Sequence, residues 1–254
     1  MNDLQLQSRG VRLRAPIWTL QERIFKTAGP ARRLSLLAAA WLLLVCGARS
    51  GLAQSQSSVP QDDTQSWTDV QVIFPIHEKV DLGILSQFRI GRDISAFVDE
   101  RAGVSLSFKL NKYLTFSPAY LYIATQPIRG LKAHENRLMF TGTVRWPVGR
   151  FTFIDRNQIE RRLRRPINST RYRNRLQIEH PVKISGSVFQ PYISDEVFYD
   201  WNLHAWVRNR FAVGVSKALT RWLTGELYYM RQNDGRSRPG DLHVIGSGLR
   251  IRLF

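Results

Sequence analysis

The feature that most constrains this chain is a repeated alternation of apolar and polar residues, which begins near Trp67 and continues to the C-terminal residues. Between Arg101 and Leu110, Ala, Val, Leu, Phe and Leu side chains share one face, and Arg, Gly, Ser, Ser and Lys share the other. A period of two residues indicates β-strands whose two faces meet different surroundings. Since no stretch has a convincing helical period, the sequence predicts an all-β fold.

Turn residues divide the alternation into eleven segments, most of about ten residues, within a chain of 254 residues. The predicted strands are residues 66–74, 80–91, 101–110, 114–125, 134–146, 151–163, 170–180, 188–199, 206–216, 222–232 and 241–253.

Alternation by itself fits a soluble two-sheet sandwich as well as a membrane barrel, but two further patterns favour the barrel. Tight turns (PIHEK, NKY, PVGR, KISGS, KALTR) alternate with connections that are mostly longer and richer in charge, which is typical of outer-membrane barrels. Aromatic residues also flank the tight turns, as in an interfacial girdle. They are Phe74, Phe108, Tyr113, Trp146, Phe151, Phe189, Trp222 and Phe254.

The last strand supports the same fold, because the chain ends in LRIRLF. A final strand that runs to a terminal aromatic or Leu resembles the signal by which barrel-assembly machinery recognises its clients. We expect Leu249, Ile251 and Leu253 to face lipid and Arg250 and Arg252 to face a polar lumen, because charges in a spanning strand can only face inward. The sequence therefore predicts an antiparallel up-and-down transmembrane β-barrel of about 10–12 strands.

The eleven visible strands raise a question of parity, since bacterial single-chain barrels usually have even strand numbers. If the last strand descends to the periplasm, the first must also descend. The polar segment of residues 54–65 must then return the chain, either as a twelfth strand, which we favour, or as a thread through the lumen.

The N-terminal residues 1–53 have the organisation of a signal peptide with a long basic front. An apolar run, LSLLAAAWLLLV, follows Arg32-Arg33, and a site for cleavage lies after Ala53. The run is shorter than the roughly 20 residues of a spanning helix. Arg32-Arg33 is also compatible with twin-arginine export. We expect a signal peptide (1–53), a polar segment (54–65) and a barrel (66–254) that holds no cysteine for a disulfide.

Several short motifs, in order along the chain, resemble the family called domain of unknown function 2490. They are Trp67-Thr68-Asp69, Phe108-Lys109-Leu110-Asn111-Lys112, Glu135-Asn136-Arg137, Arg173-Asn174-Arg175-Leu176 and Tyr229-Met230-Arg231-Gln232. The resemblance spans almost the whole mature chain. It implies an outer-membrane barrel of a Gram-negative bacterium and no agreed activity.

An internal repeat places Arg137, Arg175 and Arg210 in similar Asn-Arg-Leu or Asn-Arg-Phe triplets, spaced 38 and 35 residues apart. Because each lies near the start of an odd-numbered strand, we expect an arginine belt near the extracellular mouth. The belt could be a selectivity or ligand-binding ring. Alternatively, its arginines could pair across a narrow lumen with acidic neighbours and fill it. Those neighbours would include Glu135, Glu179, Glu196 and Glu226.

The densest charge lies around the connection that follows residue 163. Nucleic acid is not expected in the predicted compartment, so lipopolysaccharide phosphates are the nearer partner, since guanidinium groups bind phosphate in a fork. The alternative is a solvated loop between lumen-facing arginines. The candidate contacts are Arg161, Arg162, Arg164, Arg165, Arg171 and Arg173.

Signals for catalysis are weak, and we expect no cofactor and no metal. The five histidines lie apart without metal-ligand spacing. Asn233-Asp234-Gly235-Arg236-Ser237 resembles a stretch of outer-membrane phospholipases, but no histidine precedes Ser237 nearby to act as its base, and His243 follows it by six residues. An ordinary Asp-Gly turn explains the same residues.

The sequence therefore predicts a non-enzymatic outer-membrane barrel, either structural or a small-solute pore with an anion-leaning lumen. The expected partners are outer-membrane lipids, lipopolysaccharide and the barrel-assembly machinery. A lipid-modifying hydrolase and a soluble exported β-sandwich are the alternatives.

Overall fold

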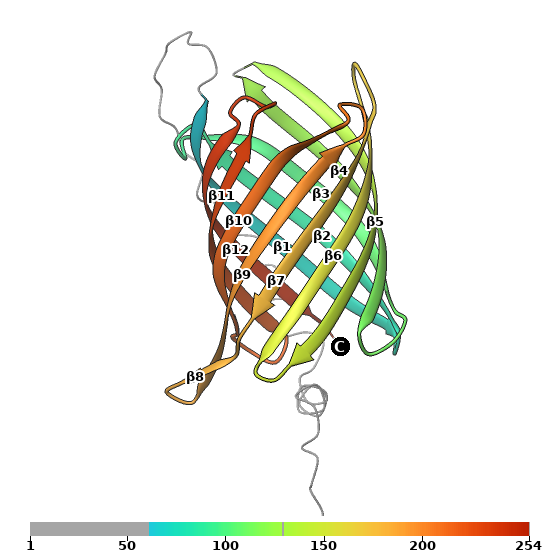
Figure 1. Ribbon diagram of the computed structural model, residues 1–254, viewed down its shortest axis with the longest axis vertical. Coiled ribbons are helices and arrows are strands. Elements are labelled where there is room, and N and C mark those ends of the chain that lie inside the picture. The colour runs from blue at the N-terminus through green and yellow to red at the C-terminus, as the bar shows by residue number, and fades with distance from the viewer. Residues whose placement is uncertain (1–60, 129, 254) are drawn as a thin grey trace, which may run out of the picture. The chain divides into compact units, whose positions relative to one another are not determined.

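The computed structural model describes residues 61–128 and 130–253, and these form strands and short connections (Figure 1). No helix in this part of the chain is long and apolar enough to cross a membrane. The predicted signal peptide and most of the polar segment lie outside the described residues. The strands are β1 (Asp62–His77), β2 (Val80–Gly91), β3 (Ala96–Lys109), β4 (Leu114–Ile128), β5 (Leu131–Val148), β6 (Phe151–Arg164), β7 (Ser169–Glu179), β8 (Val182–Ile184), β9 (Ser187–Asp200), β10 (Ala205–Ala218), β11 (Leu223–Asp234) and β12 (Asp241–Arg252).

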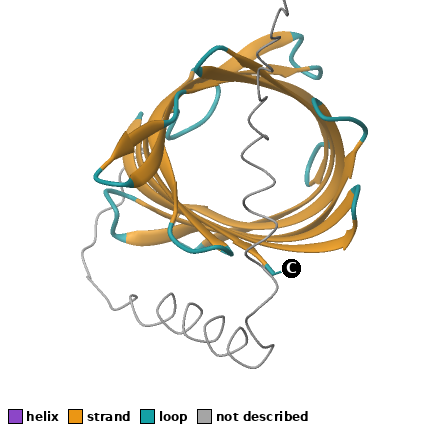
Figure 2. Ribbon diagram, turned by 90° about the horizontal axis from the view of Figure 1, so that it is seen from below, coloured by secondary structure: helices purple, strands orange, loops and turns teal. Residues whose placement is uncertain are grey.

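Eleven of these strands close into a barrel, because β9 pairs with both β7 and β10, and β12 pairs with β1 (Figure 2). The short strand β8 pairs only with β9 among the described strands and extends one hairpin beyond the wall. All eleven predicted strands are present. The predicted fold class is confirmed, with one exception to its antiparallel pairing.

The exception is the seam, where β1 and β12 run parallel, from Asp62 opposite Asp241 to Ile73 opposite Arg252. The expectation of twelve strands is therefore wrong. Instead of returning the chain as a further strand, Asp62 to Gln65 lengthen β1 and take their own hydrogen-bonded partners on β12. A parallel seam closes an odd number of strands without leaving an edge.

The barrel has two ends, which we name by their connections. The turn end carries Glu78–Lys79, Gly149–Arg150, the β8 hairpin and the end of β12. The loop end carries Arg92–Ser95, Trp201–His204, Gly235–Gly240 and the start of β1. The connections at the two ends differ less in length than expected. β3 and β5 begin earlier than predicted, so they include most of the residues that were expected to form the loops before them.

The outer face is mainly apolar and has an aromatic rim at each end. Register places the predicted girdle residues Phe74, Phe108, Trp146, Phe151 and Phe189 on the outer face near the turn end. A second rim, not predicted, lies toward the loop end. It includes Tyr122 against His134, and Trp206 against Tyr172 and Tyr199. Two rims that border an apolar band are typical of membrane barrels.

A polar group interrupts the apolar outer face on β6 and β7. Asn174 donates to Asp155 over 2.6 Å and to Asn157 over 3.1 Å, and Tyr172 also donates to Asn157. These residues satisfy one another, which lowers the cost of exposing them to an apolar phase.

The inner face holds the packed core of the molecule. Register brings Trp67, Met230, Leu242 and Val244 inward on β1, β11 and β12, where they form one apolar cluster with Ala212. Gly246 belongs to this surface, and a Cβ there would clash with the Tyr228 ring, so β12 needs glycine at this close approach.

Candidate functional site: the lumen

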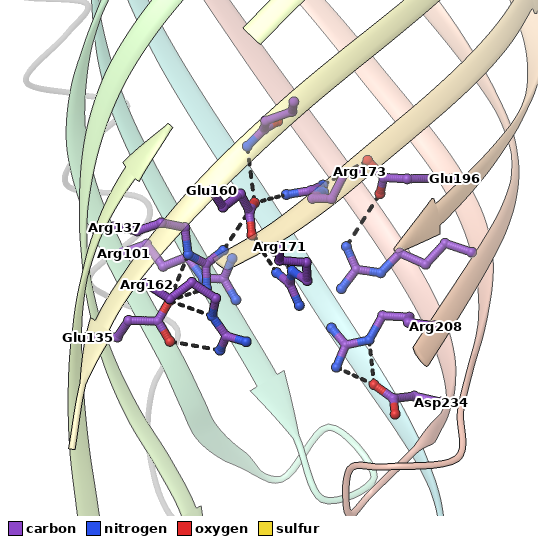
Figure 3. A network of polar contacts seen from close by, with 12 residues as sticks. Arg101, Glu135, Arg137, Glu160, Arg162, Arg171, Arg173, Glu196, Arg208 and Asp234 are labelled. Carbon is purple, nitrogen blue, oxygen red and sulfur yellow. Dashed lines mark hydrogen bonds and ion pairs between the residues drawn. The ribbon is translucent and has the colours of Figure 1, made fainter. Parts of the chain in front are cut away.

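Charged side chains fill the loop-end half of the lumen between β5 and β11. Alternation puts every second residue of a strand inward, and on these strands many of those positions are Arg or Glu. We call this set the lumen network, and Figure 3 shows part of it together with Arg101 of β3. Its members are Glu135, Arg137, Arg156, Glu160, Arg162, Arg171, Arg173, Arg175, Glu196, Arg208, Arg210 and Asp234.

Glu160 is the centre of the network and is fully buried. Arg171 donates to one of its oxygens through two nitrogens, at 2.6 and 3.0 Å. Arg173 donates to the other oxygen over 2.6 Å, and Arg137 approaches the same oxygen at 3.4 Å. One carboxylate thus joins arginines from β5 and β7, which ties opposite sides of β6 together.

Glu135 extends the network toward the loop end. Arg162 donates to both of its oxygens, over 2.9 and 2.8 Å, and Arg137 donates to one of them over 2.7 Å. Arg137 therefore lies between two carboxylates, and only 5% of its side chain is exposed. This half of the network therefore pairs two carboxylates with four arginines, Arg137, Arg162, Arg171 and Arg173.

An aromatic ring occupies the middle of the network. Phe198 is completely buried, and the guanidinium carbons of Arg171, Arg173, Arg208 and Arg210 lie 4.7–5.5 Å from its ring centre. Guanidinium groups are attracted to ring faces at such distances. The ring thus fills space that four cations would otherwise leave between them.

A different balance of charge exists around Glu196. Arg156, Arg175, Glu196 and Arg210 are successive partners across β6, β7, β9 and β10, so they form one row on the inner wall. Glu196 contacts Arg156 at 2.6 Å, Arg173 at 2.8 Å and Arg210 at 3.6 Å. Three arginines therefore contact Glu196, and Arg173 is shared with Glu160. In register, Arg175 is placed between Arg156 and Glu196.

The turn-end half of the lumen is more open than the network. The exposed fraction of inward side chains is 43% for Arg145, 39% for Lys109 and 35% for Arg252, against 6% for Arg171 and 0% for Glu160. We call this half the vestibule. Arg252 pairs with Asp81 there, and register turns Arg250 inward as well, which confirms the expected orientation of both arginines.

The predicted arginine belt is only partly assembled. Arg137, Arg175 and Arg210 all face inward. Each is the sixth or seventh residue of its strand, so they lie within the barrel wall and not at its mouth. Arg137 belongs to the Glu160 cluster, whereas Arg175 and Arg210 flank Glu196.

The predicted pairing with acidic neighbours holds for Glu135 and Glu196. Glu179 instead pairs with Arg145, and Glu226 accepts from Tyr192.

The six candidate lipopolysaccharide contacts do not form one surface. Arg162, Arg171 and Arg173 face the lumen and bind Glu135 or Glu160, so they are not available to a lipid. Register also turns Arg164 inward, at the loop end of β6. Arg161 faces outward and donates to Thr170, and Arg165 lies in the exposed connection.

The serine of the hydrolase alternative does not meet a histidine. Ser237 donates its hydroxyl to the carbonyl oxygen of Pro239. His243 lies on the outer face, where both ring nitrogens contact other side chains, Tyr229 and Arg231. Among the described residues no group of His, Cys, Asp and Glu is arranged to hold a metal ion.

Sequence reasoning did not identify the roles of Glu160, Phe198 and Arg156. The sixth strand alternates poorly and its faces could not be assigned, so the inward direction of Glu160 and Arg156 was hidden. Phe198 is in phase with Glu196 and Asp200, and that phase is the signal that could have placed an aromatic ring in the lumen.

The solved structures that are similar to this chain share little sequence identity with it. LpxR from Salmonella typhimurium is 8% identical, with a TM-score of 0.46, over 68% of this chain and 83% of that chain. The anion-selective porin from Comamonas acidovorans is 14% identical, with a TM-score of 0.33, over 66% of this chain and 55% of that chain. The outer-membrane OmpT of Vibrio cholerae is 11% identical, with a TM-score of 0.34, over 62% of this chain and 55% of that chain.

No curated protein matches the sequence. A family model described as "Protein of unknown function (DUF2490)" matches residues 64–243, from the third residue of β1 to the third residue of β12. This range includes ten of the eleven wall strands almost completely and the whole lumen network. The chain therefore belongs to the DUF2490 family.

Proposed function

We propose that the protein is a non-enzymatic outer-membrane barrel that attracts small anions into its vestibule and is closed to free diffusion by the lumen network. The observation that carries this proposal is the gradient of exposure along the lumen, from 43% at Arg145 to 0% at Glu160. A paired and buried network at one end supports closure, and the arginines of the open end support a preference for anions.

The proposed setting is the outer membrane, reached by export through the N-terminal signal peptide. An apolar outer face with two aromatic rims supports this setting. Outer-membrane lipids and the barrel-assembly machinery are the proposed partners, and nucleic acid is not one. For lipopolysaccharide phosphates, the proposal retains Arg161 and Arg165 as contacts, because both are exposed and neither has an ion pair within the described part of the chain.

Planar-bilayer recording of the refolded barrel tests the proposal. We expect little steady conductance from the natural protein, and a reversal potential in a salt gradient that reports anion preference for any current. Replacing Glu160 and Arg171 together by Ala removes the fully buried carboxylate of the network and its two-nitrogen partner without changing net charge, so conductance should rise. Large steady steps from the natural barrel would contradict closure, and cation preference would contradict the anion-attracting vestibule.

The matched control replaces Glu179 and Arg145 by Ala. This pair also faces inward and also leaves net charge unchanged, but Arg145 belongs to the vestibule and is 43% exposed. Its removal should leave the conductance at the natural level. An equal rise in both variants would mean that the network is not the barrier.

A further inference from the structure

Arginines outnumber carboxylates around Glu196. Arg156 and Arg175 are direct cross-strand partners with no carboxylate between them. Like charges placed directly opposite each other across a sheet are destabilising. Glu196 is already shared by Arg156, Arg173 and Arg210, so it cannot also neutralise Arg175.

Unused hydrogen-bond donors lie at the same place. The Nε groups of Arg156, Arg173 and Arg175 are all buried and have no hydrogen-bond partner among the described residues. In that part of the chain Arg175 has no ion pair or hydrogen bond at all, although it carries five donors. Buried hydrogen-bond donors are costly when they are unpartnered.

The site can be reached from the vestibule. Arg156 is 26% exposed, more than the Glu160 arginines, and it lies on the turn-end side of Glu160 on β6. An anion that enters from the turn end would meet Arg156 and Arg175 before it met the paired network.

We infer that Arg156 and Arg175, with Arg173 and Arg210 behind them, form a binding site for a phosphate-type oxyanion in the lumen. Guanidinium forks match the geometry of such oxyanions. Arg156, Arg175 and Arg210 exceed the single charge of Glu196 by two even when Arg173 is assigned to Glu160, and one doubly charged anion would offset that excess. This inference rests on the proposed function and names its ligand class as phosphate or sulfate, either free or carried by a small solute.

Titration calorimetry of the refolded full-length mature barrel with inorganic phosphate, sulfate and glucose 6-phosphate tests the site. We expect saturable binding at constant ionic strength, and a loss of affinity of about tenfold or more in Arg175→Gln. Arg175→Gln should fold well, because the residue makes no hydrogen bond within the described chain and its removal relieves repulsion with Arg156. Similar affinities for phosphate and glucose 6-phosphate would indicate a site for the oxyanion group itself. A clear preference for one of them would show whether the ligand is a free oxyanion or a small solute that carries one.

Arg250→Gln is the matched control, because it removes one inward, exposed arginine of the vestibule and no member of the row. It should bind phosphate as tightly as the natural barrel. Equal affinity in Arg175→Gln and Arg250→Gln, or no saturable binding by the natural barrel, would overturn the site. If binding fails while currents remain anion-selective, only this inference falls. If binding holds while the currents are not anion-selective, the proposed function falls.

Discussion

At the scale of single residues, the lumen network shows how one carboxylate can organise several arginines. Glu160 has no exposed surface and accepts from arginines on two other strands, β5 and β7. Burying an ion pair gives little net stability, but removing one partner leaves the other charges buried and uncompensated. The network should therefore be sensitive to the loss of its acids.

Glu160→Gln should lower the free energy of unfolding by about 3–5 kcal/mol, because Arg171, Arg173 and Arg137 lose their shared carboxylate. Glu179→Gln is the control and should cost no more than about 1 kcal/mol, because Arg145 remains substantially hydrated. Denaturant titration of the barrel in detergent micelles, followed by tryptophan fluorescence, measures both. Similar losses for the two variants would show that burial of Glu160 does not control the cost.

At the scale of strands, the seam is the feature that determines the count of eleven. Its parallel register places Thr68 beside Ser247 on the outer face, where their hydroxyls lie 3.2 Å apart. A twelfth strand between β1 and β12 would separate these residues by a further strand spacing of about 4.8 Å.

Thr68→Cys combined with Ser247→Cys should form a disulfide readily in the refolded mature barrel, because directly paired strand residues have suitable Cα separations. Thr68→Cys with Gly248→Cys is the control, since residue 248 faces inward and should not cross-link. Gel mobility with and without reductant reads the result. Efficient cross-linking of the control pair alone would contradict the register.

Much of the strand arrangement could be predicted from the sequence, because strand period and turn residues act locally. The bounds of β2 were predicted to the residue, and the inward orientation of Arg250 and Arg252 followed from alternation. The parallel seam could not be predicted, since it depends on a pairing between the two ends of the barrel. The Glu196 row was also hidden, because cross-strand register decides which arginines share a carboxylate.

At the scale of the whole molecule, an odd number of strands places the two ends of the wall on opposite sides. β1 starts at the loop end, whereas β12 finishes at the turn end (Figure 1). An even, wholly antiparallel barrel would place both on one side.

An epitope inserted just before Asp62 should be accessible on the same side of the membrane as one inserted in Gly235–Gly240. An epitope within Gly149–Arg150 should be accessible only on the opposite side. Antibody binding to intact and permeabilised cells distinguishes the sides. Shared accessibility of the Asp62 and Gly149 epitopes would rule out the parallel seam.

The seam also has a consequence for the order of folding. Other neighbouring wall strands are joined by short connections, but Thr68 and Ser247 are 179 residues apart in the chain. Because loop-closure entropy makes such distant pairings slow, the wall can grow hairpin by hairpin while its first and last strands remain unpaired. Until closure, β1 and β12 each expose a sheet edge able to pair with other chains. The slowest step in making this barrel should therefore be the meeting of its two outermost strands, and aggregation before that step should increase with protein concentration.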